Sequence, residues 1–190
     1  MIPASLAAQV SDGVLRALDF ALENIGVCED PVGSNRGPEI DAWTRELGSP
    51  VGSFWCAIAV AKARKEGGLW IPAHDAGACN EWLYEARLLR LTSDTPVPGA
   101  AVLYTNRVPV ASGPYAGQLD VVHIGLVLRV TPVLMSIEGN TTLGKYDRNG
   151  YVQTLKEVDR SRVMCYVLPG VAVKTVAGGE PLNQRAGGSS

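Results

Sequence analysis

The fold follows from one stretch of sequence, Val121-Val122-His123-Ile124-Gly125-Leu126-Val127-Leu128-Arg129-Val130. Its even-numbered positions are all large and apolar, whereas the odd-numbered ones include His123, Gly125 and Arg129. Alternation of this kind is typical of a β-strand that buries one face in a core. The stretch therefore predicts a strand with a buried even face and with His123 on its odd face.

The next apolar run, residues 133–138, predicts a second strand that pairs with the first. If Thr131-Pro132 centres a symmetric turn, His123 lies opposite Asn140 and Gly125 lies opposite Glu138. Both Glu138 and Asn140 then reach the imidazole. A slip of one residue would rotate both to the other side of the sheet, and Thr-Pro is not a strong hairpin signal, so the prediction depends on the turn.

The rest of the chain divides into a helical half and a strand half. Apolar residues recur at helical spacing from Leu6 to Ile25, and further helices are predicted from Pro38, from Ser53 as N-cap to Gly67, and over residues 80–89. Beyond residue 98, β-rich runs are separated by Gly, Pro and Asn; they cover residues 101–104, 121–130, 133–138, 151–155 and 162–168. Helices followed by an antiparallel sheet predict an α+β fold.

Cys56 is the candidate nucleophile because it lies in the first turn of the predicted helix. Unpaired N–H groups and the positive end of the helix dipole favour a thiolate there. If this helix packs against the odd face of the strand, His123 can pair with the thiolate and later protonate a leaving amine. Glu138 or Asn140 would hold the ring in one tautomer. This combination indicates a cysteine amidohydrolase.

An oxyanion would form in such a reaction, and the backbone N–H of Cys56 can bind it. Asn35 or Ser34 is a candidate for the second donor, which makes Asn35 a candidate substrate-binding residue. Trp55, next to the thiol, is a candidate substrate contact and also a candidate packing residue.

Each of these features also has a purely structural interpretation. Cysteine is among the most buried residue types, so Cys56 can be part of the core. His123 can be a hydrogen-bonded half-buried histidine, and residues 138–140 can form a turn. The functional interpretation depends on the three features occurring together.

Composition excludes several classes of protein. The chain has 190 residues, a formal net charge of -2 and no basic stripe, so no nucleic-acid partner is expected. No segment approaches the roughly 20 apolar residues of a membrane span, and the first residues do not have the pattern of a signal peptide. The four cysteines are scattered without CxxC spacing, so we expect reduced thiols and neither a metal site nor a cofactor.

The chain is long enough for one domain with a full core. We expect a single catalytic domain over residues 1–173 and a monomeric protein. Residues 174–190 contain too few apolar side chains to pack, so a disordered tail is expected there.

Five segments of the chain resemble the CHAP family, the cysteine- and histidine-dependent amidohydrolases/peptidases that are related to NlpC-type enzymes and common in phage endolysins. The likeness extends over roughly residues 15 to 169. It rests on Gly-Ser-Asn-Arg-Gly-Pro-Glu-Ile-Asp (33–41), Phe-Trp-Cys-Ala (54–57), Pro-Gly-Ala-Ala-Val-Leu (98–103), Val-His-Ile-Gly-Leu-Val (122–127) and Ile-Glu-Gly-Asn-Thr (137–141). Ala100 departs from the family, in which many members have an aspartate.

The resemblance implies a papain-like α+β fold and hydrolysis of an amide bond in the peptide of peptidoglycan. It assigns the nucleophile to Cys56, the base to His123 and supporting roles to Glu138 and Asn140. Calcium, which some members bind through acidic residues near the cysteine, is not expected, because residues 48–60 contain none.

The implied enzyme is an N-acetylmuramoyl-L-alanine amidase or a peptide endopeptidase. It would be made in the cytoplasm without a signal peptide and would reach the wall by phage lysis or by an injection system. Two alternatives remain at this point: a thiol amidohydrolase or deamidase toxin with another substrate, and an inactive structural module of a phage tail.

Overall fold

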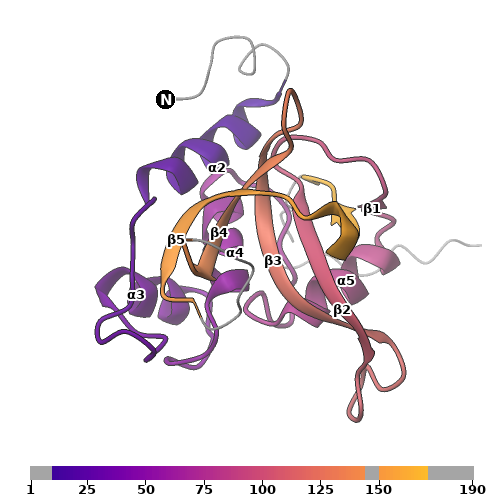
Figure 1. Cartoon of the computed structure of the whole chain (residues 1–190), viewed down its shortest axis with the longest axis horizontal. Coiled ribbons are helices and arrows are strands. Elements are labelled where there is room, and N and C mark those ends of the chain that lie inside the picture. Colours follow the sequence, from indigo (N-terminus) through magenta and orange to yellow (C-terminus); the bar gives the residue numbers. More distant parts are fainter. Residues whose placement is uncertain (1–9, 144–149, 171–190) are drawn as a thin grey trace, which may run out of the picture.

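The computed structural model describes residues 10–143 and 150–170. Within them, four helices precede a six-stranded sheet, so the predicted α+β class is confirmed (Figure 1). The helices are α2 (Asp12–Glu23), α3 (Pro38–Glu46), α4 (Cys56–Glu66) and α5 (Cys79–Leu88). The strands are β1 (Thr92–Ser93), β2 (Ala101–Pro109), β3 (Leu119–Arg129), β4 (Met135–Thr141), β5 (Val152–Glu157) and β6 (Val163–Val167), with a 3-10 turn at Arg160–Arg162.

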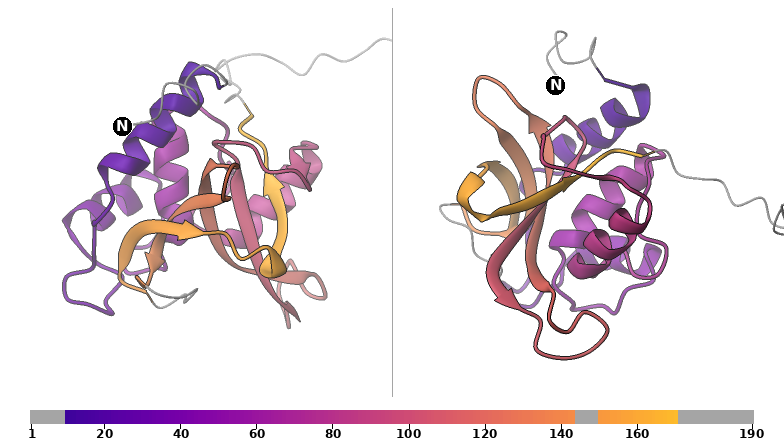
Figure 2. Two further views of the ribbon diagram at one scale, coloured as in Figure 1. Left: turned by 45° about the horizontal axis from the view of Figure 1, so that its top comes forward. Right: turned by 90° about the vertical axis from the view of Figure 1, so that its right-hand side faces the viewer.

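The strands form one antiparallel sheet in the order β1-β6-β2-β3-β4-β5. Helices α2, α4 and α5 gather on one side of it, as the right-hand view of Figure 2 shows. The core between these layers contains Ala57 and Val60 of α4 together with Ile124 and Leu126 of β3. The even face of the predicted strand is therefore buried, as expected.

The odd face of β3 is buried as well, which the alternating pattern did not predict. Val127 belongs to a second apolar cluster, which includes Val102 and Tyr104 of β2 and Leu134, the residue before β4. The condition that α4 packs against the odd face is not met, because the helix side of the core contains the even residues Ile124 and Leu126.

A β-bulge in β3 changes the alternation next to His123. Tyr104 pairs with His123 and Thr105 pairs with Val121, so β3 has one extra residue, Val122, at this point. A bulge bends the strand and redirects side chains. Val121 accordingly lies in the same apolar cluster as Ile124, although strict alternation would place the two on opposite faces.

The predicted register between β3 and β4 agrees with the structure in the centre of the hairpin. Leu126 pairs with Ile137 and Val127 with Ser136, as the symmetric turn requires. The register shifts by one residue nearer the turn. A Cβ atom on Gly125 would lie 2.7 Å from Cγ of Glu138, so the glycine leaves the space that this carboxylate fills.

Local sequence explains most helix boundaries. The Ser11 hydroxyl accepts a hydrogen bond from the Val14 N–H at the start of α2, and Pro38 occupies the first position of α3. Two expectations were wrong: α2 ends before Ile25, which is exposed, and the residue that caps α4 is Trp55 rather than Ser53.

A buried arginine joins α4 to the end of the last strand. Arg64 is 0% exposed, lies against the rings of Trp70 and Trp82, and donates hydrogen bonds to the carbonyls of Val167 and Leu168. Burial lowers the pKa of Arg64 to about 9. The cation and two aromatic faces thus connect the helical layer to β6.

The helices in the described part of the chain are all too short or too polar to cross a membrane. The expected disordered tail, residues 174–190, lies outside the described residues.

Gly139 provides the first test of this packing. A Cβ atom there would lie 2.7 Å from Cζ3 of Trp55 and 2.8 Å from Cβ of Ala59, so β4 and α4 approach each other too closely for a side chain. We expect Gly139→Ala to lower the free energy of unfolding by about 1–3 kcal/mol in urea denaturation, because the layers must separate. Val108→Ala, at an exposed position, should change it by less than about 0.5 kcal/mol. Equal stability of the two variants would contradict this packing.

Candidate active site

Cys56 is the first residue of α4, as the sequence predicts for a nucleophile, and only 5% of its surface is exposed. The pKa of its thiol is lowered well below the usual value. The largest cause is a hydrogen bond with Cys79, which burial opposes; the charge of His123 and the N–H of Ala57 lower it further. The surroundings of Cys56 therefore favour the thiolate, which is the reactive form.

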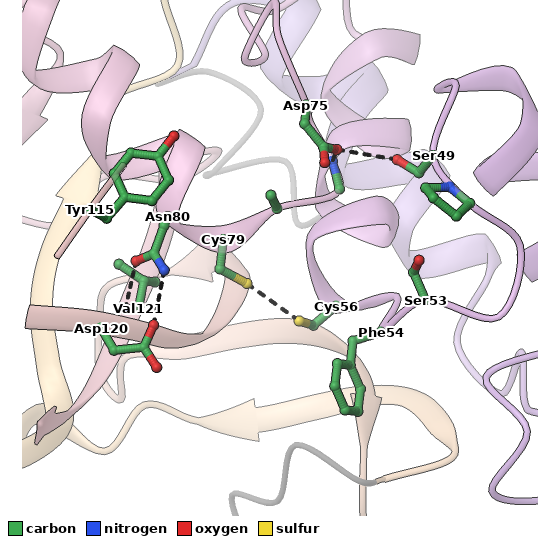
Figure 3. A pocket seen from close by; sticks show the side chains of 13 residues that line it. Ser49, Ser53, Phe54, Cys56, Asp75, Cys79, Asn80, Tyr115, Asp120 and Val121 are labelled. Carbon is green, nitrogen blue, oxygen red and sulfur yellow. Dashed lines mark hydrogen bonds between the residues drawn. The ribbon is translucent and has the colours of Figure 1, made fainter. Parts of the chain in front are cut away.

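The sulfur of Cys56 faces a cleft with a volume of about 320 Å³. Figure 3 shows the cleft between the loop before α4, the start of α5 and the beginning of β3. Phe54, Asp75 and Asp120 contribute to its walls, whereas His123 is not among the residues that line it. The sulfur of Cys56 therefore borders the cleft directly, and His123 lies behind the residues that line it.

His123 is buried and bonded to Glu138. Its Nε2 lies 3.0 Å from Oε2 of Glu138, whose side chain is fully buried. Burial by itself would lower the pKa of His123, but interactions with Cys56 and Glu138 raise it to about 10. The interactions with Cys56 and Glu138 therefore favour the imidazolium form of the ring.

The other ring nitrogen of His123, Nδ1, is available to interact with Cys56. Nδ1 is buried and has no hydrogen-bond partner among the described residues. Its ring nevertheless interacts with Cys56 strongly enough to shift the pKa of both groups. Catalytic hydrogen bonds are often poorly aligned before substrate binds, so a nucleophile and its base can have this geometry.

Three side chains hold Glu138. Besides His123, the hydroxyl groups of Tyr104 and Ser136 donate to Oε1 at 2.7 and 2.6 Å. Burial tends to raise the pKa of Glu138, but these bonds lower it overall. The Tyr104 ring also stacks on the imidazole, with centroids 5.8 Å apart. Glu138 thus remains a carboxylate and fixes the orientation of His123.

Asn140 lies at the end of the same strand and is fully buried, with a positive φ of 51°. Its side-chain amide donates to Oδ1 of Asn35 at 3.0 Å, and Asn35 also has a positive φ, 54°. The structure therefore joins the two predicted asparagines to each other. Glu138, by contrast, is bonded to the His123 ring, through Nε2.

Trp55 has a packing role. The side chain is 0% exposed, lies in a cluster with Ile40 and Ile58, and donates from Nε1 to Oε1 of Glu29 at 3.0 Å. The expectation of a substrate contact is thus not met, because a sealed indole cannot touch a ligand. Phe54, 47% exposed, lines the cleft instead.

Sequence reasoning missed several residues of the site: Glu29, Cys79, Tyr104 and Ser136. Ser136 could have been found, since it lies two residues before Glu138 on one strand and so shares its face. Tyr104 could not, because the register of β2 against β3 depends on the long connection between them. Glu29 and Cys79 lie in or beside loops whose course the sequence does not fix.

No group of three or more metal-ligating side chains occurs in the part of the chain that the structure describes. No family model matches the sequence, and no curated protein or solved structure matches it either.

The ionisation of Cys56 gives a testable pH dependence. A lowered thiol pKa means that the thiolate persists at pH values below the usual 8.5 and is lost only as the pH falls through the lowered value. Site-resolved alkylation by iodoacetamide should therefore remain fast for Cys56 at pH 7. In His123→Ala, the midpoint of this alkylation should move to higher pH. An unchanged midpoint would show that His123 does not act on the sulfur.

Tyr104→Phe tests the support of Glu138. The variant keeps the stacked ring but removes one hydrogen bond to a buried carboxylate, so we expect a loss of about 1.5–3 kcal/mol of stability in urea denaturation. Tyr84→Phe, at an exposed tyrosine, is the matched control. A Tyr104→Phe variant as stable as Tyr84→Phe would mean that the Tyr104 hydroxyl does not support the carboxylate.

Proposed function

We propose that this chain is a cysteine amidohydrolase of the CHAP type, with a papain-like fold, that cleaves an amide bond in the peptide of peptidoglycan. The observation that carries the proposal is the position of Cys56, at a helix N-terminus, next to the imidazolium of His123. Glu138 bonds the other nitrogen of that ring. These are the nucleophile, the base and the orienting group of thioester chemistry.

In the acylation step, the Cys56 thiolate attacks the carbonyl carbon of the scissile amide. The first N–H groups of α4 have no intrahelical acceptors, so the backbone N–H of Cys56 can bind the oxyanion that forms. His123 transfers its Nδ1 proton to the nitrogen of the leaving amine as the C–N bond breaks. The products of this step are a thioester on Cys56, a free amine and a neutral imidazole.

In the deacylation step, neutral His123 removes a proton from a water molecule that attacks the thioester. The thiolate leaves, the new carboxyl product departs, and the thiolate–imidazolium pair is restored. Glu138 stabilises the imidazolium in each cycle because its carboxylate accepts from Nε2. Since Tyr104 and Ser136 keep Glu138 ionised, the pair is ready before substrate arrives.

The choice of a wall peptide as substrate is supported by the sequence resemblance. The five segments that carry the resemblance include residues 33–41. In the structure, Asn35 of this segment accepts a hydrogen bond from Asn140. The cleft beside Cys56 is open to solvent and large enough for a short peptide segment. The reaction would be that of an N-acetylmuramoyl-L-alanine amidase or a peptide endopeptidase, acting at the wall after phage lysis or injection.

Purified protein should solubilise peptidoglycan sacculi, and mass spectrometry of the released muropeptides should show one new amino or carboxyl terminus. Cys56→Ala should lose this activity, because no thioester can form. Glu138→Gln should reduce it by roughly 10²–10⁴-fold, since the imidazolium loses its counter-charge. Cys28→Ala, at an exposed cysteine away from the cleft, is the control and should remain active.

Full activity in Cys56→Ala would contradict the proposal. Intact sacculi together with fast alkylation of Cys56 would instead favour a thiol amidohydrolase with another substrate. An unreactive Cys56 would indicate an inactive structural module.

A further inference from the structure

A second cysteine contacts the proposed nucleophile. The sulfur atoms of Cys56 and Cys79 are 3.6 Å apart, and neither is in a disulfide. Each residue is the first of its helix, and both line the same cleft. Figure 3 shows the two side chains pointing toward each other across it. The hydrolytic mechanism uses only one of these thiols.

Hydrogen bonds around Cys79 hold it in this position. Asn80, the next residue, donates from Nδ2 to Asp120 at 2.9 Å and accepts from the Val121 N–H at 2.9 Å, which fixes the start of α5 to β3. The preceding loop is held by Asp75, which accepts from the Gly77 N–H at 2.9 Å. Hydrogen bonds on the residues before and after Cys79 therefore fix its position next to Cys56.

We propose that Cys56 and Cys79 form a redox modification site, in which a peroxide converts the two thiols into a disulfide that a dithiol reductant reverses. The sulfurs need to approach from 3.6 Å to the bond length of about 2.05 Å. Both side chains border the open cleft, which leaves them room to rotate toward each other.

The chemistry balances with hydrogen peroxide as the oxidant. The Cys56 thiolate attacks one peroxide oxygen, the O–O bond breaks, and a sulfenic acid and hydroxide form. The Cys79 thiol then attacks the sulfenic sulfur; the S–S bond forms and water leaves with the thiol proton. A dithiol reverses the process by thiol–disulfide exchange, which reduces both cysteines and oxidises the reductant to its own disulfide.

Two consequences follow for the site. The disulfide removes the nucleophile, so the protein would be inactive while oxidised; this consequence rests on the proposed function. It also protects Cys56, because a sulfenic acid captured by a neighbouring thiol is not oxidised further to the irreversible sulfinic acid. Formation of the disulfide itself does not depend on which substrate the site accepts.

The test treats the full-length protein with hydrogen peroxide and maps its cysteines by mass spectrometry without reduction. We expect a linked pair of peptides that contain Cys56 and Cys79, and we expect dithiothreitol to restore alkylation of both. In Cys79→Ser, whose hydroxyl can still donate to the Cys56 sulfur, Cys56 should be oxidised to sulfinic or sulfonic acid, and dithiothreitol should restore little of the thiol. Cys165→Ser, which alters a buried cysteine outside the cleft, is the matched control and should behave like the wild type.

Oxidation of wild-type Cys56 without a link to Cys79 would overturn the proposal. So would a wild-type Cys56 that resists excess peroxide, or full recovery of the thiol in the folded Cys79→Ser variant, with folding checked by circular dichroism. The sacculus assay tests the proposed function, and the peptide map tests the disulfide. If reduced protein never solubilises sacculi, the proposed function fails. The peptide map still shows whether the disulfide forms.

Discussion

The buried hydrogen bond between His123 and Glu138 is the interaction on which the site depends. A carboxylate taken out of water is costly unless its oxygens are bonded and its charge is paired. Here the imidazolium pairs with one oxygen, and the hydroxyls of Tyr104 and Ser136 bond the other. These groups come from β2, β3 and β4, so three strands must be in one register for the carboxylate to be satisfied. Gly125 leaves the space in which it lies.

The helical layer then places the sulfur. Gly139 lets β4 approach Trp55 and Ala59 closely, and Trp55 is fixed in turn by its bond to Glu29. The start of α4 is thus set against the strands that carry the imidazole. Because Cys56 begins this helix, the backbone N–H of Ala57 bonds its sulfur, and Cys79 and His123 also favour the thiolate. Sheet and helix together favour a charged pair beside the cleft.

Much of the fold could be predicted from local patterns. Alternation in residues 121–130 and helical spacing before residue 90 predicted the α+β class, and Pro38 predicted the start of α3. The central register of the β3–β4 hairpin was also predicted. Side chains alternate between the two faces of a strand, so few ways of pairing two strands bury one face of both. This placed Glu138 beside His123.

The remaining parts depend on contacts between distant segments. No local pattern indicates the bulge at Val122, so strict alternation places Val121 and Ile124 on opposite faces, although both pack in the cluster that contains the α4 residues. Cys79 lies 23 residues from Cys56, and the two meet through long-range contacts such as the Asn80 anchor to β3. Trp55 was a candidate substrate contact because it adjoins the candidate nucleophile, but long-range packing and its bond to Glu29 bury it.

The central claim is that His123 is charged because it lies between the Cys56 thiolate and the Glu138 carboxylate. Nitrogen NMR of the imidazole rings tests it most directly, since the chain has two histidines and His74 is exposed. The account predicts protons on both ring nitrogens of His123 at pH 8, and loss of one with a midpoint near pH 10. A neutral His123 ring at pH 8, with a midpoint near the ordinary value of about 6.5, would contradict it.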